Sequence, residues 1–312
     1  MRGLLMKNNN PTPAPIALFV YSRLGHAQRT INALKRNLLA SDTELFIFSD
    51  GPKTKEKIPE VNAVRKYLRS VKGFKSVKIF ESRKNKGLAA SITYGVTKIV
   101  NKYGRVIVVE DDIFTSPYFL TFMNNALNYY ENDSRVISIS GYTYPIKDLP
   151  ETFFLKNAEC WGWGTWKRGW DLFESDGKKL LLALEKRNLA SEFDFNNSYD
   201  YTQMLKDQIA KKNNSWAIRW YASAFLKDKL TLYPRVSLAQ NIGVDGTGTH
   251  GGLVNVYSVN LSKRNISVGK IPVIESREAR KKFELFFRKI RSRYYRVFVF
   301  AKNYIKRALL PQ

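Results

Sequence analysis

The sequence predicts an α/β fold with a mainly parallel sheet flanked by helices, and two observations lead to this prediction. Short apolar runs rich in β-branched residues recur along the first half of the chain, a pattern typical of strands buried on both faces. Segments with apolar residues at helical spacing lie between these runs, and this alternation favours a parallel sheet covered by helices. The strand-like runs are IALFV at 16–20, LFIF at 45–48, VKIF at 77–80, VIVV at 106–109 and VISI at 136–139.

The predicted helices between these strands each have one apolar face, and a similar helix is expected after the fourth strand. The residues on these faces are Ala27, Ile31, Leu34 and Leu38; Val61, Val64, Leu68 and Val71; Leu88, Ile92, Val96 and Ile99; and Phe119, Phe122, Met123, Ala126 and Tyr130.

The composition indicates a folded, strongly basic protein. The chain has 312 residues, of which 44% are hydrophobic, which is enough for a sizeable core. A net charge of +25 predicts an anionic partner. The single cysteine, Cys160, cannot form an internal disulfide, which fits a reducing compartment. Because no run of about 18 apolar residues occurs, no transmembrane helix is predicted.

Three carboxylates, Glu110, Asp111 and Asp112, directly follow the strand-like run VIVV. Adjacent negative charges repel one another, so a positive partner is expected beside them. In a parallel sheet, ligands bind at the carboxyl ends of strands, where these acids lie. Carboxylate oxygens are the ligands that Mg²⁺ and Mn²⁺ prefer. The sequence therefore predicts a Mn²⁺ or Mg²⁺ site here, although a solvated acidic turn would have the same residues.

Four segments of the first half together resemble one enzyme family. They are PIALFVYSRLGHAQRTINAL, LFIFSDG, ESRKNKGLAASITYGV and VIVVEDDIFTSPYFLTF, within residues 15–130. They resemble nucleotide-sugar glycosyltransferases with the GT-A fold, a Rossmann-like sheet, and are most similar to the N-acetylglucosaminyltransferase I type. The resemblance extends more weakly through WGWGTWKRGW to NIGVDGTGTHGG.

The resemblance implies roles for five residues of the donor side. Asp112 would bind the metal, while Asp111 and Glu110 would contact the ribose or sugar of the donor. Arg23, after the first strand, and Asp50, after the second, would contact the nucleotide. Without the resemblance, Arg23 would be interpreted as a surface cation and Asp50 as a turn residue before Gly-Pro.

Further contacts are expected from three other segments. Asn85 and Lys86 open a predicted helix and would approach the donor through backbone amides and a positive charge, or would only cap that helix. His250, in a glycine-rich loop that could close over the nucleotide, would lie near the diphosphate. Trp161 and Trp163 offer flat apolar faces to an acceptor sugar, although tryptophans are also common core residues.

An inverting transferase needs a carboxylate that takes the proton of the acceptor hydroxyl. Asp207, on a predicted helix at 201–212, is the residue predicted for this role, with Asp200 and Asp245 as alternatives. The family that the chain resembles has two acids between two tryptophans in a comparable place. This chain has SWAIRW at 215–220 instead, so it departs from the family pattern at that point.

The chain is expected to divide into four regions. Residues 1–14 form a disordered tail, 15–140 the nucleotide-sugar-binding half, and 141–262 the acceptor-side and catalytic half of the same domain, which is α+β. Residues 263–312 form a basic and aromatic tail, with a helix whose cations and aromatic rings suit the surface of an anionic membrane. Nucleic acid could bind the same pattern, but no nucleic-acid-binding module is present, and the acids would then be unexplained.

These expectations combine into one prediction. The chain would be a metal-dependent glycosyltransferase that moves a hexosyl or N-acetylhexosaminyl group from a nucleotide-diphosphate donor, most simply UDP-linked, with inversion. Its acceptor would be a glycan or lipid-linked sugar of surface polysaccharide assembly, such as lipopolysaccharide or capsule. It would be cytoplasmic, attached peripherally to the inner face of the membrane. The alternatives are a sugar nucleotidyltransferase and a non-catalytic basic protein that binds membranes or nucleic acid.

Overall fold

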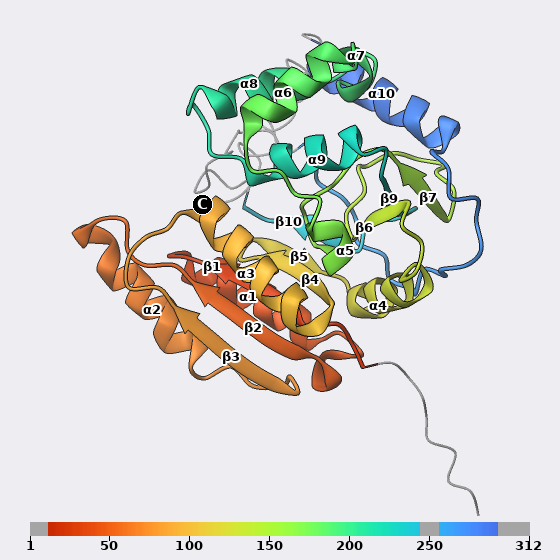
Figure 1. Ribbon diagram of the computed structural model, residues 1–312. Coiled ribbons are helices and arrows are strands. Elements are labelled where there is room, and N and C mark those ends of the chain that lie inside the picture. Colours follow the sequence, from red (N-terminus) through yellow and green to blue (C-terminus); the bar gives the residue numbers. More distant parts are fainter. Residues whose placement is uncertain (1–11, 244–255, 293–312) are drawn as a thin grey trace, which may run out of the picture.

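A computed structural model describes residues 12–243 and 256–292 and contains a central sheet of eight strands (Figure 1). The strands of this sheet are β1 (Ile16–Val20), β2 (Glu44–Ser49), β3 (Ser76–Glu81), β4 (Arg105–Glu110), β6 (Val136–Ser140), β7 (Thr152–Leu155), β8 (Trp163–Trp166) and β9 (Leu230–Pro234). Their spatial order is β3-β2-β1-β4-β8-β6-β9-β7, so both halves of the chain contribute to one sheet.

The directions of the strands confirm the predicted fold class. Neighbouring strands from β3 to β4 are parallel, as are β6 and β9, whereas β8 and β7 run antiparallel to their neighbours. A separate antiparallel pair consists of β5 (Ile113–Thr115) and β10 (Ala239–Asn241). Because β1, β2, β3 and β4 are parallel, their carboxyl ends meet at one edge of the sheet, where the predicted donor-side residues follow them.

Helices connect and cover the strands. They are α1 (Leu24–Lys35), α2 (Ile58–Leu68), α3 (Leu88–Tyr103), α4 (Phe119–Tyr129), α5 (Lys167–Trp170), α6 (Gly177–Lys186), α7 (Ala190–Phe193), α8 (Tyr201–Ile209), α9 (Trp216–Leu226) and α10 (Arg277–Arg291), with short 3₁₀ turns at Ala40–Asp42 and Lys55–Lys57. α1 contacts α2, while α3 packs on β1 and β4 and also contacts α5 and α9. None of the helices in the described ranges is long and apolar enough to span a membrane.

Burial follows the patterns of the sequence. All residues of β1 are buried, and Val106–Val109 of β4 are at most 1% exposed, as expected for apolar strands inside a sheet. β3, at the edge, is half-buried. α3 ends at Gly104, whose φ of +76° gives the left-handed conformation that commonly terminates a helix.

The tryptophan-rich segment 160–170 forms a strand and a short helix. Trp163 lies in β8 and is fully buried, and its ring lies 5.4 Å from that of Trp216 and 5.6 Å from that of Trp220. The expectation that Trp163 contacts an acceptor is therefore corrected, because its faces pack against other side chains. Trp161 is half-buried beside Tyr142, with 4.7 Å between ring centroids.

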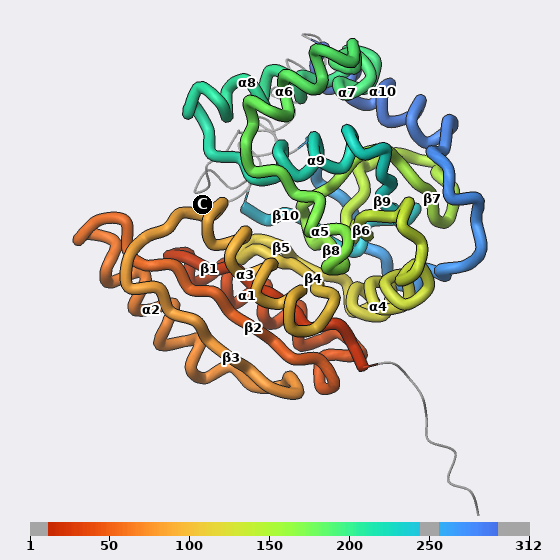
Figure 2. Tube along the Cα trace, in the orientation of Figure 1, coloured from red at the N-terminus to blue at the C-terminus, as the bar shows by residue number. Residues whose placement is uncertain are grey.

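The aromatic face of the basic tail is part of the core. Phe283 and Phe287 of α10 are fully buried, and Phe283 lies 6.3 Å from Phe195, next to α7. Figure 2 shows the same relationship, with the C-terminal α10 beside the helices of the middle of the chain. Two of the aromatic rings that the sequence offered to a membrane are thus covered by protein. The exposed residues of α10 are four cations together with Glu278 and Leu285.

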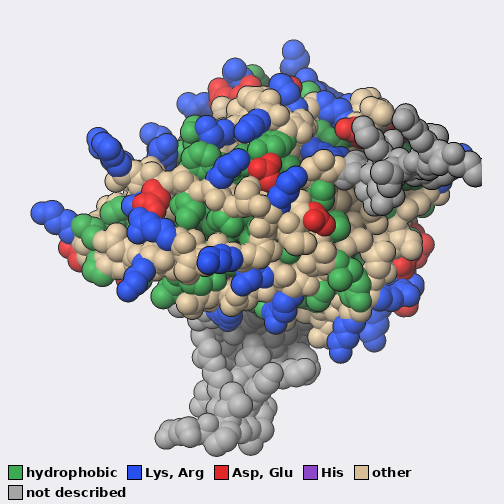
Figure 3. All heavy atoms as spheres, turned by 90° about the horizontal axis from the view of Figure 1, so that it is seen from below, with side chains coloured by type: hydrophobic (Ala, Val, Ile, Leu, Met, Phe, Trp, Pro, Cys, Tyr) green, Lys and Arg blue, Asp and Glu red, His purple; other side chains and the backbone are tan. Residues whose placement is uncertain are grey.

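Lys and Arg side chains are spread over the face shown in Figure 3, with few acidic side chains between them. Such a surface attracts anions over distances set by the ionic strength.

Candidate functional site

The acidic residues after β4 meet an arginine that follows β1. One nitrogen of Arg23, Nη2, donates to Asp111 Oδ1 at 2.5 Å and to Asp112 Oδ2 at 2.8 Å. Burial lowers the pKa of Arg23, but the two carboxylates outweigh that effect and hold this pKa above its ordinary value. The sequence predicted these residues in one site, and the structure brings them into direct contact.

Glu110, the last residue of β4, is oriented toward α9. Its pKa is raised to about 8, first by burial and then by the charges of Asp112 and Asp111, while Arg23 and a hydrogen bond from Trp216 act in the opposite direction. A buried carboxyl next to two other acids favours the protonated form. Glu110 therefore adds a weakly ionised carboxyl to the site near neutral pH.

Asp112 lies beneath the chain that follows β10. Its backbone carbonyl accepts a hydrogen bond from the N–H of Ile242 at 2.7 Å. A Cβ at Gly243 would lie 2.3 Å from Asp112 Oδ2, so only glycine permits this approach. Within the described parts of the chain, Asp112 Oδ1 is buried and has no hydrogen-bond partner, whereas Oδ2 is bonded to Arg23.

The carboxylate of Asp50 fixes the loop that precedes α3. This carboxylate accepts hydrogen bonds from the backbone N–H groups of Gly51 at 2.8 Å, Lys86 at 2.9 Å and Gly87 at 2.9 Å. The side chain of Asn85 donates to the carbonyl of Gly51 at 2.8 Å. The expectation that the amides of this loop reach the donor is corrected for Lys86, whose N–H is bonded to Asp50.

A cavity of about 320 Å³ adjoins this loop. Its lining includes Asp50, Lys86, Tyr94 and the rings of Phe48 and Phe80, which are stacked with centroids 5.0 Å apart. The amine of Lys86 lies 4.8 Å from the centre of the Tyr94 ring. The cavity thus offers aromatic rings, one cation and the carboxylates of Asp50 and Glu81 at the carboxyl ends of β2 and β3.

In the part of the chain that the structure describes, a divalent cation would find only a few ligating side chains at this site. The described residues contain no group of three or more His, Cys, Asp and Glu side chains that would hold a metal ion by themselves. Mg²⁺, however, is commonly held by one or two carboxylates together with substrate phosphates. The unpartnered Oδ1 of Asp112 meets that smaller requirement.

Two other predicted residues lie elsewhere. Asp207 is on α8, where Gln203 donates to it at 3.0 Å and the amine of Lys212 lies 3.5 Å away. None of its interactions within the described parts of the chain reaches Glu110, Asp111 or Asp112. His250 lies outside the described residues.

Sequence reasoning missed Glu159, a carboxylate that is only 8% exposed. Its Oε1 accepts a hydrogen bond from the N–H of Cys160 at 3.0 Å, and burial raises its pKa. Burial first, and then the charges of Glu159 and Glu110, raise the pKa of the Cys160 thiol, so this thiol lies between Glu159 and the acidic cluster in its electrostatic surroundings. A lone glutamate in AECWGW has no sequence pattern that would have identified it.

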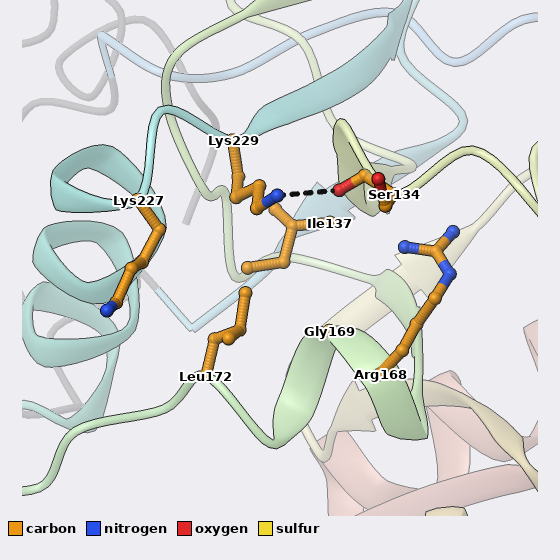
Figure 4. Close-up of a pocket in the computed structure, with 7 residues that line it drawn as sticks. All are labelled: Ser134, Ile137, Arg168, Gly169, Leu172, Lys227 and Lys229. Carbon is orange, nitrogen blue, oxygen red and sulfur yellow. Dashed lines mark hydrogen bonds between the residues drawn. The ribbon is translucent and has the colours of Figure 1, made fainter.

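A second cavity, of about 310 Å³, is lined by cations but is not a convincing anion site (Figure 4). The guanidinium of Arg168 donates to the carbonyls of Tyr130 at 2.8 Å, Glu131 at 2.9 Å and Val136 at 2.6 Å. Lys229 donates to the carbonyl of Ser134 at 2.9 Å. Arg168 and Lys229 therefore bond to backbone carbonyls at the ends of neighbouring helices and strands.

No family model and no curated protein matches this chain. Solved structures with partial likeness include a mannosyltransferase, PcManGT, from Pyrobaculum calidifontis in complex with GDP-Man and Mn²⁺ (12% identity, 71% of this chain and 74% of that chain, TM-score 0.35). Others are TarS of S. aureus (13%, 46% and 24%, TM-score 0.31) and a UDP-glucose pyrophosphorylase complexed with UDP-glucose (12%, 74% and 94%, TM-score 0.39). These TM-scores are too low to establish a common fold, so the function must rest on the geometry of the site.

Proposed function

We propose that this protein is a metal-dependent glycosyltransferase that uses a nucleotide-diphosphate sugar, UDP-linked, and passes the sugar to a glycan or lipid-linked acceptor with inversion. One observation supports it above the others: Arg23, Asp111 and Asp112 meet at the carboxyl edge of the parallel strands. Ligands of α/β sheets bind at this edge, and a cation beside carboxylates suits a diphosphate bridged by a metal.

Each residue of the site would contact a different part of the nucleotide sugar. Arg23 supplies a permanent positive charge for the diphosphate. Its side chain is partly shielded from water, where charges interact strongly. Asp50 keeps the loop before α3 in place, and the cavity beside it takes the nucleoside between aromatic walls. Glu110 and Asp111 bind hydroxyl groups of the ribose or sugar.

Asp112 would hold Mn²⁺ or Mg²⁺ through its free oxygen, together with the donor phosphates. A divalent cation in this place neutralises the charge that develops on the leaving diphosphate.

The acceptor side needs a carboxylate that takes the proton of the acceptor hydroxyl. Asp207 is the predicted proton acceptor, and Glu159 is the alternative that the structure adds. A carboxyl with a raised pKa is a more effective base near neutral pH than an ordinary one, which favours Glu159. Trp161, half-buried and packed on Tyr142, leaves part of its ring for a sugar.

An anionic membrane surface remains the proposed location of the acceptor. The exposed cations of α10 and the basic face in Figure 3 support attachment by charge, at roughly 1 kcal/mol for each Lys or Arg near the surface. Attachment at the inner face would place the enzyme beside lipid-linked sugars.

Calorimetry with nucleotides tests the proposed function. UDP should bind in the presence of Mn²⁺ and only weakly without it, and a screen of nucleotide sugars should identify one that is slowly hydrolysed. Release of pyrophosphate from UTP and a sugar phosphate would instead identify a nucleotidyltransferase. Tight binding of RNA with no metal-dependent nucleotide binding would favour the non-catalytic alternative.

A further inference from the structure

Arg23 occupies Oδ2 of Asp112, the oxygen next to the free Oδ1 through which Asp112 would hold a divalent cation. A single nitrogen of its guanidinium contacts carboxylates of two adjacent residues, Asp111 at 2.5 Å and Asp112 at 2.8 Å. Arg23 and Asp111 are separated by 88 positions in the sequence, so the contact is a product of the sheet and not of local chain geometry. The arginine thus makes the bridge between carboxylates that a metal ion makes in many sites.

The surroundings leave the bridge incomplete. Arg23 Nη1 and Asp112 Oδ1 are both buried, and neither has a hydrogen-bond partner among residues 12–243 and 256–292. Leaving such groups unpaired is costly, particularly for charged groups. The two unpaired atoms are a donor and an acceptor, and a diphosphate together with its cation would satisfy both of them.

The backbone leaves the Arg23 side chain free to change its contact. Arg23 is the N-cap residue of α1, so its backbone is held at the start of the helix, while its guanidinium, which has only donors, cannot cap that helix. Its side chain is 24% exposed, in contrast to 7% for Asp111 and 13% for Asp112. The carboxylates are therefore fixed by their surroundings, whereas the arginine has an open side toward solvent.

We propose that Arg23 is an internal counter-cation that competes with the divalent cation for Asp112. A donor diphosphate draws the guanidinium away from the carboxylates, and both oxygens of Asp112 then become available to the metal. The proposal rests on the proposed function and adds to it a coupling between nucleotide and metal. Its consequence is that the metal alone binds weakly, and that the diphosphate strengthens metal binding by removing a competitor.

Linkage gives this proposal a measurable form. If the diphosphate displaces Arg23, it increases the affinity for Mn²⁺ in two ways. It adds bonds between metal and phosphate, and it removes the arginine that competes with the metal. A variant without the competitor should bind Mn²⁺ alone more tightly and should gain less from the nucleotide. If loss of the arginine charge acted only through the electrostatic field at the site, the Mn²⁺ affinity would rise equally with and without nucleotide. The increase in Mn²⁺ affinity caused by the nucleotide would then stay the same.

The test is a calorimetric titration of the full chain with Mn²⁺, alone and with saturating UDP, for the wild type and Arg23→Gln. We expect Arg23→Gln to bind Mn²⁺ alone about tenfold or more tightly, and the gain from UDP to fall by a similar factor. Arg29→Gln is the matched control, because Arg29 is an exposed arginine of the same helix whose side chain donates to the carbonyl of Gly25. It should behave like the wild type.

Equal Mn²⁺ affinities of the wild type and Arg23→Gln would overturn the proposal, as would an unchanged gain from UDP. If Arg23→Gln does not fold, Arg23→Met replaces it. The methionine side chain has neither the charge nor a donor, so the Mn²⁺ affinity of this variant should exceed that of the wild type, and an unchanged value would refute the competition. If the wild type binds no nucleotide with any metal, the proposed function fails, while the titrations with Mn²⁺ alone still decide whether Arg23 competes.

Discussion

The carboxylate of Asp50 accepts a hydrogen bond at 2.9 Å from the backbone N–H of Gly87, just before α3. The bond joins the end of β2 to the loop that follows β3. The two segments approach so closely that a Cβ at Gly51 would lie 2.5 Å from the carbonyl carbon of Lys84. The donor side therefore has a rigid wall that consists of two loops held by one carboxylate.

Asp50→Ala should loosen that wall without unfolding the protein. Three backbone N–H groups would lose their acceptor, which should cost about 1–3 kcal/mol of stability. Hydrogen exchange of residues 84–87 should accelerate, and UDP should bind more weakly. Asp171→Ala is the control, because Asp171 forms an exposed ion pair with Lys167 and should change stability by less than about 1 kcal/mol. Unchanged exchange at 84–87 would contradict the role of Asp50.

Asp112→Ala should abolish metal-dependent binding of UDP while the protein stays folded. The variant removes the carboxylate with the unpartnered oxygen, whereas Arg23 keeps its bond to Asp111. Calorimetry with Mn²⁺ and UDP measures the loss, and circular dichroism confirms folding. Normal Mn²⁺-dependent binding in this variant would show that the metal lies elsewhere.

The proton acceptor can be identified by two conservative variants. Asp207→Asn should leave UDP binding nearly intact and lower turnover about 10²-fold or more. Wild-type turnover in that variant, together with a loss of the same size in Glu159→Gln, would assign the role to Glu159. A variant that loses donor binding as well as turnover would indicate a structural role instead.

Glu159 should make stability depend on pH. Burial raises its pKa above the ordinary 4.5, so the folded protein keeps this proton in a range where the unfolded chain has lost it. The stabilisation is therefore fully present below about pH 4.5 and is lost as the pH rises through the raised pKa of the folded state. Urea unfolding between about pH 5 and pH 8 should show a steeper decline for the wild type than for Glu159→Gln. Parallel curves would exclude this contribution.

The role of the tail depends on where the chain is cut. A chain that ends at Ser276 lacks α10, and because Phe283 and Phe287 are fully buried it should unfold or lose much of its stability. A chain that ends at Ser292 keeps α10 and is the informative variant. Co-sedimentation with anionic vesicles should be weaker for this chain than for the full chain, and it should fall with salt because the attraction is screened. Equal sedimentation of both chains would place membrane attachment outside residues 293–312.

Local patterns in the sequence predicted much of the fold. The run VIVV was expected to form a strand at 106–109, and β4 spans Arg105–Glu110. IALFV coincides with β1, and VISI lies within β6. These predictions succeeded because burial and periodicity are properties of short segments, and three acids after an apolar strand mark an edge of the sheet whatever the rest of the chain does.

The tertiary structure alone decided which residues meet. No periodicity relates Arg23 to Asp112, 89 positions away, and their contact depends on the adjacent parallel strands β1 and β4. An apolar helix face shows that another surface covers it, but the sequence does not say which surface. The sequence therefore allowed the rings of α10 to be assigned to a membrane, whereas Phe283 and Phe287 are buried by the protein itself. The same holds for Trp163, since a tryptophan suits a sugar and a core equally well, and only the packing of distant segments separates the two.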